Sequence, residues 1–576
     1  MSPRAPDRLL RVDLSAERVR SEPVPDGWRR RYVGGKGLGA RYLYDELEPG
    51  TDPLGPENVL LFMLGPVSGY LPGEGRYAAI TRSPLTGAFL DSYAGGEFPT
   101  TLAGALGDHV GVLVSGSASE PVHLVVEDGD ARIERTPSWG ADAVDTAREF
   151  PEAAVACIGP AGEQQVLYST IASDEATHHA GRGGAGAVMG SKRLKAIVAR
   201  GEPPTPDDAL LALRERATKR YGESETGRWQ TTSETLETVD FADATDVLAA
   251  RGWQERGFEG ADDVGIEPAR EAATGRERDD EIPGGFRIET EDGETVPRGA
   301  TGMSLGAGLG IDDFEAVVEL GDRCNRLGLD LIDAGNAVAW AIRATDAGLL
   351  ERDLSFGNPA DARRLLGEIA TRETDLGDAL ADGVDAAGRR YGGEAFVPSV
   401  KRMSLPSYDP RGTTSMALAY ATSDRGGCHR RARPIEREAF DGPWSPERAA
   451  RAVLAAQNRR SLQWSLVADD FVGESLEVSA WLEAVDAPYA DLEAAGARIW
   501  TLVRLFNVRE GFDRTDDELP PAIEADAAFD DRRFEAALET YYAIRGWDER
   551  GRPTPETVAR LGLEDVGEGA RVRNDR

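Results

Sequence analysis

Lysine and cysteine are both scarce in this chain of 576 residues. With a net charge of −35, the surface is acidic and its cations are almost all arginines. Such a field repels nucleic acids and anionic membranes, so neither is expected as a partner. An acidic, lysine-poor surface is typical of proteins in a high-salt cytoplasm, where screening makes like charge tolerable. We favour that halophile-like interpretation over a surface shaped for one basic partner. The lysines are Lys36, Lys192, Lys195, Lys219 and Lys401.

The three cysteines, Cys157, Cys324 and Cys428, are far apart and odd in number, which argues against a disulfide framework. Long hydrophobic runs are also missing, because no stretch approaches 18 apolar residues. The first residues, "MSPRAPDRLL", lack the apolar core of a signal peptide. We therefore expect a soluble cytoplasmic protein.

A chain of this length exceeds what one hydrophobic core supports and should divide into roughly three domains. Up to about residue 204 the sequence is rich in glycine, and short apolar runs alternate with turns. It predicts strands at 59–65, 109–116, 121–129 and 194–201, followed by a linker over 201–209. Helical spacing dominates later, at 310–330, 334–350, 445–466, 492–512 and 529–547. The polar stretch 222–298 is expected to be irregular.

Three glycine-rich segments, at 34–47, 72–98 and 181–186, bring backbone N–H groups within reach of a ligand. "GRGGAG" at 181–186 matches the dinucleotide fingerprint, but no strand is expected before it, which disfavours a Rossmann unit. Each loop alone is typical of an ordinary turn. Three together, two of them with an arginine, favour a site for a large phosphate-bearing ligand.

Two histidine motifs remain. "SDRGGCHRRARP" at 423–434 could form a metal site, a nucleophile with its base, or an anion-binding turn. The pair His178 and His179 has no carboxylate or cysteine at ligand spacing, so we expect it on the surface or in a loop. The acidic run at 276–281 is expected to be solvated loop. No residue is assigned as a metal ligand.

Several segments in order resemble the tungsten-dependent aldehyde ferredoxin oxidoreductase family. They include "VGGKGLGARYLYDEL", "GRYAAITRSPLTG", "AGRGGAGAVMGSKRLKAIVARG", "YDPRGTTSMALAYATSDRGGCH" and "YYAIRGWDERGRPTPETVARLGL". The resemblance spans almost the whole chain and is weakest over 222–298. It implies an α+β fold, with a mainly β cofactor-binding domain at 1–204 and two mainly helical domains at 205–400 and 401–576.

The resemblance also implies chemistry. Family members hold tungsten, sometimes molybdenum, between two pterins, with a four-iron four-sulfur cluster nearby. They oxidise small aldehydes to carboxylic acids and pass electrons to ferredoxin; a homodimer is possible. By resemblance, His429 is the active-site histidine. The cofactor contacts implied in the same way are Arg76, Gly95, Arg182, Gly183, Leu329, Asp330, Arg425 and Arg431.

The sequence departs from the family where chemistry is expected. Family members carry three cluster cysteines in a region that matches 260–290, which has none here, and Asp469 stands in the position of the fourth. A four-iron cluster needs about four thiolates, so we predict that no cluster is bound. Ala300 replaces an active-site glutamate, and Tyr93 replaces an asparagine near the ion that bridges the pterin phosphates.

Two hypotheses stay open. In the first, the chain is an oxidoreductase that keeps the metal bis-pterin and sends electrons to ferredoxin or another carrier without a cluster of its own. Alternatively, it is a non-catalytic relative that binds the pterin or acts as a scaffold. A nicotinamide or flavin enzyme using "GRGGAG" is the weakest alternative.

Overall fold

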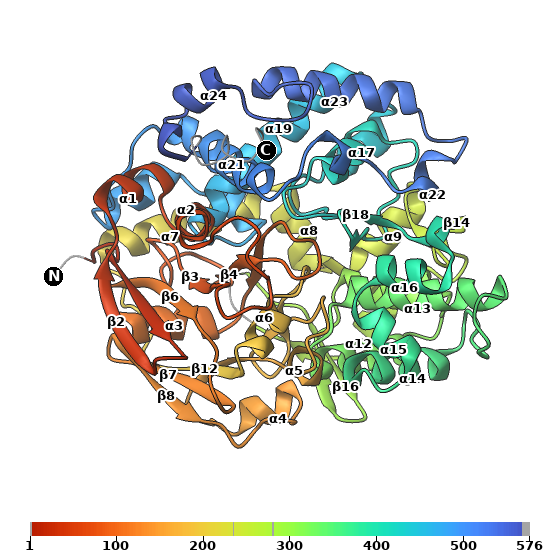
Figure 1. Ribbon diagram of the computed structural model, residues 1–576, viewed down its shortest axis with the longest axis horizontal. Coiled ribbons are helices and arrows are strands. Elements are labelled where there is room, and N and C mark those ends of the chain that lie inside the picture. The colour runs from red at the N-terminus through yellow and green to blue at the C-terminus, as the bar shows by residue number, and fades with distance from the viewer. Residues whose placement is uncertain (1–2, 234, 279–281, 567–576) are drawn as a thin grey trace.

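The computed structural model describes residues 3–233, 235–278 and 282–566. Figure 1 shows the N-terminal strands in red and orange at the lower left, green helices at the right, and blue C-terminal helices along the top. The expected fold class is confirmed. An N-terminal domain of mixed sheets comes first, and the remaining part of the chain, about two-thirds of its length, consists mainly of helices. The boundaries at residues 204 and 400 stay predictions.

Two six-stranded sheets form the N-terminal domain. The first has the order β2-β1-β6-β3-β4-β5, and the second β11-β10-β9-β12-β7-β8. Within them only β1 with β6 and β7 with β12 pair in parallel. The strands of the first sheet are β1 (Arg8–Asp13), β2 (Arg18–Pro23), β3 (Leu60–Met63), β4 (Tyr77–Arg82), β5 (Phe89–Ala94) and β6 (His109–Ser115). Those of the second are β7 (Val122–Glu127), β8 (Asp130–Arg135), β9 (Ala154–Cys157), β10 (Ile171–Ser173), β11 (His178–Ala180) and β12 (Leu194–Arg200).

One hydrophobic core joins the two sheets. Phe62 of the first sheet and Leu124 of the second belong to the same buried cluster, and α3 (Phe98–Leu106) contacts strands of both sheets. Central strands such as β3 are apolar along their whole length because they are buried on both faces. The predicted strands at 59–65, 109–116, 121–129 and 194–201 are therefore confirmed. The other helices of this domain are α1 (Asp26–Tyr32), α2 (Gly35–Glu46), α4 (Ala143–Arg148), α5 (Pro160–Glu163) and α6 (Ala185–Ser191).

The prediction that residues 222–298 are irregular is wrong for the described part of that stretch. It holds several short helices and a three-stranded antiparallel sheet, packed around Leu236, Ile266 and Phe286. These apolar residues are too widely spaced to give a periodic signal. The elements from the linker onward are α7 (Asp208–Glu223), α8 (Glu225–Ser233), α9 (Thr238–Ala244), β13 (Ala249–Ala250), β14 (Glu255–Arg256), α10 (Ile266–Ala272), β15 (Ala273–Arg276), β16 (Phe286–Thr290) and β17 (Gly293–Thr295).

The predicted long helices are confirmed. Most begin at a side-chain cap, such as Asp313 before α12, Asp330 before α13 and Ser445 before α19. Helix α19 contacts α21, α23 and the N-terminal α2. It therefore connects the C-terminal helices to α2, which packs on strand β4 of the first sheet. The helices are α12 (Phe314–Leu327), α13 (Leu331–Asp346), α14 (Pro359–Thr371), α15 (Asp375–Ala381), α16 (Val384–Tyr391), α17 (Thr414–Ala421), α18 (Ile435–Asp441), α19 (Pro446–Ser465), α20 (Val478–Ala484), α21 (Leu492–Arg509), α22 (Pro521–Glu524), α23 (Asp531–Arg545) and α24 (Pro555–Arg560), with two short strands, β18 (Ser399–Val400) and β19 (Met403–Ser404).

A buried cluster of charges joins the N-terminal and C-terminal domains. The ammonium of Lys36 lies 3.0 Å from Asp91 and 2.5 Å from Asp424, and Arg431 contacts both carboxylates. None of the four side chains is more than 3% exposed. Two cations and two anions balance, which is the condition for burying charge at acceptable cost.

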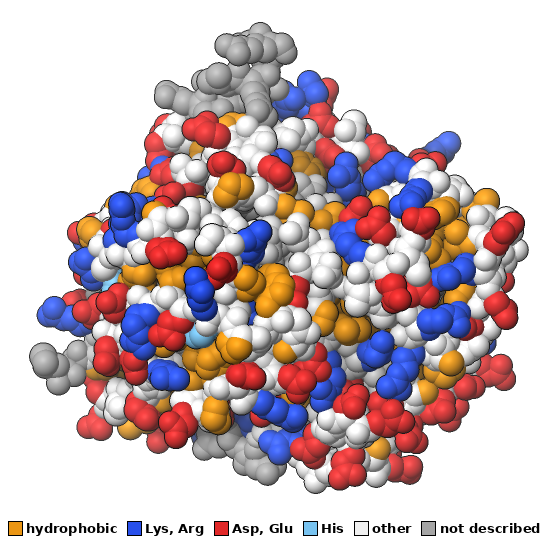
Figure 2. Space-filling model, turned by 60° about the horizontal axis from the view of Figure 1, so that its bottom comes forward, with side chains coloured by type: hydrophobic (Ala, Val, Ile, Leu, Met, Phe, Trp, Pro, Cys, Tyr) orange, Lys and Arg blue, Asp and Glu red, His pale blue; other side chains and the backbone are white. Residues whose placement is uncertain are grey.

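The outer surface is strongly charged. Figure 2 shows acidic side chains in red and basic ones in blue intermingled over one face, as the composition predicts. Across the described ranges, the helices are each too short or too polar to span a bilayer.

Candidate functional site

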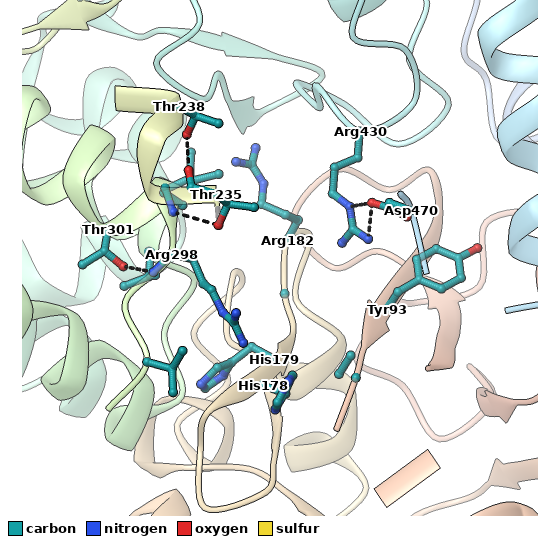
Figure 3. Close-up of a pocket in the computed structure, with 18 of the residues that line it drawn as sticks. Tyr93, His178, His179, Arg182, Thr235, Thr238, Arg298, Thr301, Arg430 and Asp470 are labelled. Carbon is teal, nitrogen blue, oxygen red and sulfur yellow. Dashed lines mark hydrogen bonds and ion pairs between the residues drawn. The ribbon is translucent and has the colours of Figure 1, made fainter. Parts of the chain in front are cut away.

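A cavity of roughly 340 Å³ lies where the N-terminal domain meets the two helical regions. Its size is typical of a small-molecule site. Its walls come from the turn after β5, from β11 and the glycine loop, from the start of α13, and from the 425–433 segment. Figure 3 shows Arg182 near the centre, His178 and His179 below it, and the Arg430–Asp470 ion pair to the right.

Seven of the nine residues predicted for the site line this cavity. They are Arg76, Gly95, Arg182, Leu329, Asp330, Arg425 and His429. The other two lie outside its lining. The carbonyl of Gly183 accepts a hydrogen bond from the Ser83 hydroxyl at 2.7 Å. Arg431 is fully buried in the charge cluster with Lys36 and donates to Asp424 at 2.7 Å. The roles of all nine toward a cofactor stay predictions.

The glycine loop at 181–186 is held tightly by its surroundings. Gly184 has a φ of +85°, and a Cβ there would lie 2.1 Å from the carbonyl oxygen of Leu167. The prediction that no strand precedes this loop is wrong, because β11 leads into it and α6 follows. However, β11 is an edge strand antiparallel to β10, so the parallel unit of a dinucleotide site is not formed.

Asp330 connects the glycine loop to helix α13. One of its oxygens accepts hydrogen bonds from the backbone N–H groups of Ile332 and Asp333, and the other accepts from the N–H of Arg182 at 3.0 Å. The sequence analysis did not identify Asp333. Its position three residues after the helix cap Asp330 places it in the first turn of α13, beside the cap, and could have indicated it. Burial raises the pKa of Asp333 to about 6, and the negative charge of Asp330 adds to the increase. The positive charge of Arg182 acts in the opposite direction but does not outweigh them.

Several buried guanidinium nitrogens have no hydrogen-bond partner among the described residues: Nε and Nη1 of Arg182, and Nε of Arg425. Both side chains are otherwise fixed, Arg182 by the carbonyl of Gly427 at 2.7 Å and Arg425 by the carbonyl of Asp91 at 2.7 Å. A buried donor without an acceptor costs about 1–3 kcal/mol. These donors, in residues that line the cavity, fit an anionic ligand with many acceptor atoms.

Cys428 lies in the cavity wall, and its sulfur accepts a hydrogen bond from Arg425 at 3.1 Å. Burial alone would raise the pKa of this thiol, but Arg425, Arg431 and Arg182 outweigh it and lower the pKa to about 7. Burial raises the other two cysteine pKa values to about 12. Cys428 is therefore the thiol that ionises near neutrality.

His429 is held as a neutral imidazole. Burial lowers its pKa well below the ordinary value, and Arg433 and Arg430 add to the effect. Its Nδ1 has no hydrogen-bond partner among the residues described, and its ring lies 5.5 Å from that of Tyr408, centroid to centroid. A neutral imidazole can polarise a carbonyl group without carrying charge. Tyr408 also lines the cavity and was missed by sequence reasoning.

The three residues that depart from the family pattern are in well-defined places. Asp469 accepts two hydrogen bonds from Arg76, at 3.1 and 2.7 Å. Ala300 lines the cavity with a methyl group. The hydroxyl of Tyr93 donates to Asp91 at 2.7 Å, and its ring stacks on Trp464 at 5.0 Å between centroids.

The predicted surface position of His178 and His179 is wrong, because both lie in strand β11 and line the cavity. His178 faces the carboxylates of Glu74 and Glu277. Burial alone would lower the pKa of His178, but those carboxylates outweigh it and raise the pKa. Glu277 is only 13% exposed, so the prediction of a solvated acidic run fails there as well. The rest of that run, 279–281, lies outside the described residues.

Comparisons with known proteins cover nearly the whole chain. The family described as "Aldehyde ferredoxin oxidoreductase, N-terminal domain" matches residues 9–201, and "Aldehyde ferredoxin oxidoreductase, domains 2 & 3" matches 212–563. A tungsten-containing aldehyde ferredoxin oxidoreductase of Pyrococcus abyssi is 31% identical over 97% of this chain and 99% of its own length. The "Aliphatic sulfonate oxidoreductase, WOR-like subunit" of Pyrococcus furiosus is 25% identical over 97% of both chains.

A solved structure gives the same arrangement. The active-site complex BamBC of benzoyl coenzyme A reductase contains a chain that superposes with a TM-score of 0.83. The match covers 99% of this chain and 98% of that one at 23% sequence identity. At that identity the likeness establishes the fold alone.

Proposed function

Because this chain belongs to the aldehyde ferredoxin oxidoreductase family, we propose that it is an oxidoreductase with a tungsten or molybdenum bis-pterin that oxidises an aldehyde to a carboxylic acid. The reaction consumes one aldehyde and one water and yields one carboxylic acid, two protons and two electrons. The electrons pass to ferredoxin or another one-electron carrier in two steps.

The observation that supports this proposal is the set of buried guanidinium nitrogens of Arg182 and Arg425 that lack a hydrogen-bond partner among the described residues, although Nε of Arg182 also lies 3.5 Å from Asp333. Guanidinium forks suit pterin phosphates. Gly95 leaves no room for a side chain, since a Cβ there would lie 2.1 Å from the Glu74 carboxyl carbon. The residues present therefore fit the group. When bound, it supplies two-electron oxidation and reduction at its metal.

In this proposal His429 binds the substrate. Its neutral imidazole donates a hydrogen bond to the aldehyde oxygen and so makes the carbonyl carbon more electrophilic. Burial, together with the surrounding arginines, lowers the pKa of the ring and keeps it unprotonated, because a positive charge there is unfavourable. Tyr408 packs beside the ring and limits its rotation.

We also propose that the protein binds no four-iron cluster. The chain has three cysteines in all, one in β9, one in α12 and one in the cavity wall. Asp469, in the position of a family cluster cysteine, is paired with Arg76. A cluster needs about four converging thiolates, so the electrons would leave for the carrier without this relay.

Ala300 supports a second candidate, a non-catalytic relative that retains the pterin pocket as a scaffold. Where family members carry a glutamate, this cavity has a methyl group, which neither donates nor accepts a proton. Loss of a positioned acid or base costs roughly 10²- to 10⁴-fold in rate.

The test is elemental analysis of protein purified anaerobically from its native host, together with aldehyde-dependent reduction of a dye. We expect about one tungsten or molybdenum per chain, no stoichiometric iron with acid-labile sulfide, and measurable dye reduction. Absence of both tungsten and molybdenum would refute the enzyme proposal. Bound metal with no turnover, in wild type and in Ala300→Glu, would favour the scaffold instead.

A further inference from the structure

Three side chains from separate segments converge on one wall of the cavity. Glu74 comes from the loop before β4, His178 from β11, and Glu277 from the segment after β15. One ligand atom from each lies within 4.8 Å of the other two. His178 Nε2 is 3.2 Å from a Glu277 oxygen and is also in contact with Glu74.

His178 is the buried polar group aimed into this cluster. Its side chain is 8% exposed, and Nε2 points at both carboxylates. Beyond these two ion-pair contacts, neither Nε2 nor the facing Glu277 oxygen has a hydrogen-bond partner among the described residues. Two carboxylate oxygens and one imidazole nitrogen with these mutual distances are a ligand set for a divalent cation.

Each of the three side chains is oriented by a further contact on its far side. Arg76 pairs with the second oxygen of Glu74 at 2.8 Å, and Arg298 pairs with the second oxygen of Glu277 at 2.9 Å. The other nitrogen of His178 contacts the hydroxyl of Thr177 at 3.1 Å and lies 3.7 Å from Asp174. A carboxylate or hydroxyl behind the imidazole and hydrogen-bonded carboxylates are the usual surroundings of metal ligands.

The local charge admits a cation in spite of the arginines. Among the described residues, four carboxylates lie at or next to the cluster, and three guanidiniums, the third being Arg278 at 3.9 Å from Glu74, oppose them. Over these groups the sum is −1 once the imidazole has lost its proton, so a divalent ion that replaces the proton brings it to +1. The carboxylates are Glu74, Glu277, Asp174 and Asp469.

We propose that Glu74, His178 and Glu277 form a binding site for one divalent transition-metal ion, such as Mn²⁺, Fe²⁺ or Zn²⁺. One imidazole with two carboxylates suits these ions better than Ca²⁺, which prefers all-oxygen sites. The ion would link the segment around Glu277 to the N-terminal domain at the cavity wall, because Glu277 comes from that segment and Glu74 and His178 come from the N-terminal domain. Its ligands line the same cavity as the predicted cofactor contacts, and none of them is a cysteine.

The experiment compares metal uptake by wild-type protein and two ligand variants, His178→Gln and Glu277→Gln. Each is treated with a chelator, dialysed, and titrated with Mn²⁺ followed by electron paramagnetic resonance, and with Zn²⁺ followed by elemental analysis. We expect one ion per wild-type chain and roughly 10- to 100-fold weaker binding in both variants.

His179→Gln is the matched control. His179 is the adjacent residue of the same strand and lines the same cavity, but it contacts Thr170 at 2.8 Å and the carbonyl of Ala176 at 2.9 Å. This variant should bind the ion as wild type does. Near-ultraviolet circular dichroism identifies any variant that fails to fold, in which case the other ligand variant decides.

Two results would overturn the proposal: wild-type protein that takes up no stoichiometric ion, or ligand variants that bind as tightly as wild type. The first would leave a protonated His178 bridging the two carboxylates. Tungsten and molybdenum are measured in the same samples. A divalent ion without tungsten or molybdenum would contradict the proposed enzyme but not this site, and the converse result would contradict this site alone.

Discussion

Arg76 and Asp469, 393 residues apart, form a two-point ion pair at the cavity wall, with Nε and Nη2 of the arginine both donating to one carboxylate oxygen. The other Asp469 oxygen accepts from the backbone N–H groups of Phe471 and Val472. The aspartate thus binds the arginine and orders its own turn. The residue that we predict, from the family resemblance, to replace a cluster cysteine is thus paired with an arginine.

Asp469→Asn should lower the free energy of unfolding by about 1–3 kcal/mol, measured by denaturant unfolding. The amide keeps the turn's acceptor oxygen but presents no charge to Arg76, which retains its ion pair with Glu74. The control is Glu447→Gln, whose partner Arg451 is 64% exposed, and it should cost less than about 0.5 kcal/mol. Equal costs for the two variants would contradict the prediction.

Lys36→Met should destabilise the protein by about 3–5 kcal/mol, because it leaves Asp91 and Asp424 buried with Arg431 as their remaining cation. Lys219→Met removes a lysine that is 78% exposed and 4.0 Å from Glu223, and should cost at most a few tenths of a kcal/mol. Denaturant midpoints of the two variants, at unchanged slope, give the comparison. A cost below about 1 kcal/mol for Lys36→Met would show that the cluster adds little.

Gly184→Ala should cost more than about 3 kcal/mol, since it combines a positive φ with a Cβ placed 2.1 Å from a carbonyl oxygen. Gly222→Ala, in helix α7 with nothing within 4 Å of its Cβ, should instead stabilise by about 0.5–1 kcal/mol. Thermal unfolding of the two alanine variants therefore shifts in opposite directions. A tolerated alanine at 184 would mean that the loop adapts.

Cys428 should ionise with a midpoint near pH 7, because three arginines hold its pKa at about 7. Protein isolated without cofactor is titrated from pH 6 to pH 9 while thiolate absorbance is followed in the ultraviolet, and the signal should correspond to one thiol. The folded state favours the thiolate, so the proton leaves as pH rises through 7. Cys428→Ser should abolish the change, whereas Cys157→Ser should leave it, since burial raises that thiol's pKa to about 12.

His429→Gln should lower aldehyde-dependent turnover by roughly 10²- to 10⁴-fold without changing the tungsten or molybdenum content. Glutamine can donate a hydrogen bond but cannot take the place of an imidazole in shape or polarity. Turnover and metal content are measured on the same preparation. Undiminished turnover would remove His429 from the proposed mechanism.

Much of the architecture could be predicted, because strands such as 194–200 and helices such as 446–465 carry strong apolar patterns. The stretch from 222 to 298 could not, since its small core draws on residues as distant as Leu236 and Val318. The glycine loop could be identified from its sequence, but the short strand before it could not be predicted. Strand β11 reads "HHA" and is buried by its partners rather than by its own hydrophobicity.

The site shows the same division. The family resemblance pointed to seven residues that do line the cavity, because each matching motif is a local feature of the chain. The cluster of Glu74, His178 and Glu277 could not be foreseen, as its members are about a hundred residues apart in the sequence. Arg431 illustrates the opposite case, a residue within a site motif whose side chain points into the buried charge cluster.

The contact between Lys36 and Asp424 cannot form until the ribosome has synthesised both residues. At roughly 5–20 residues per second, the 388 residues that separate them take on the order of 20–80 s to translate. Throughout that interval the nascent N-terminal domain holds an ammonium whose second carboxylate partner has not yet been made. The first domain to leave the ribosome is therefore electrostatically complete only when the segment that carries Asp424 has emerged.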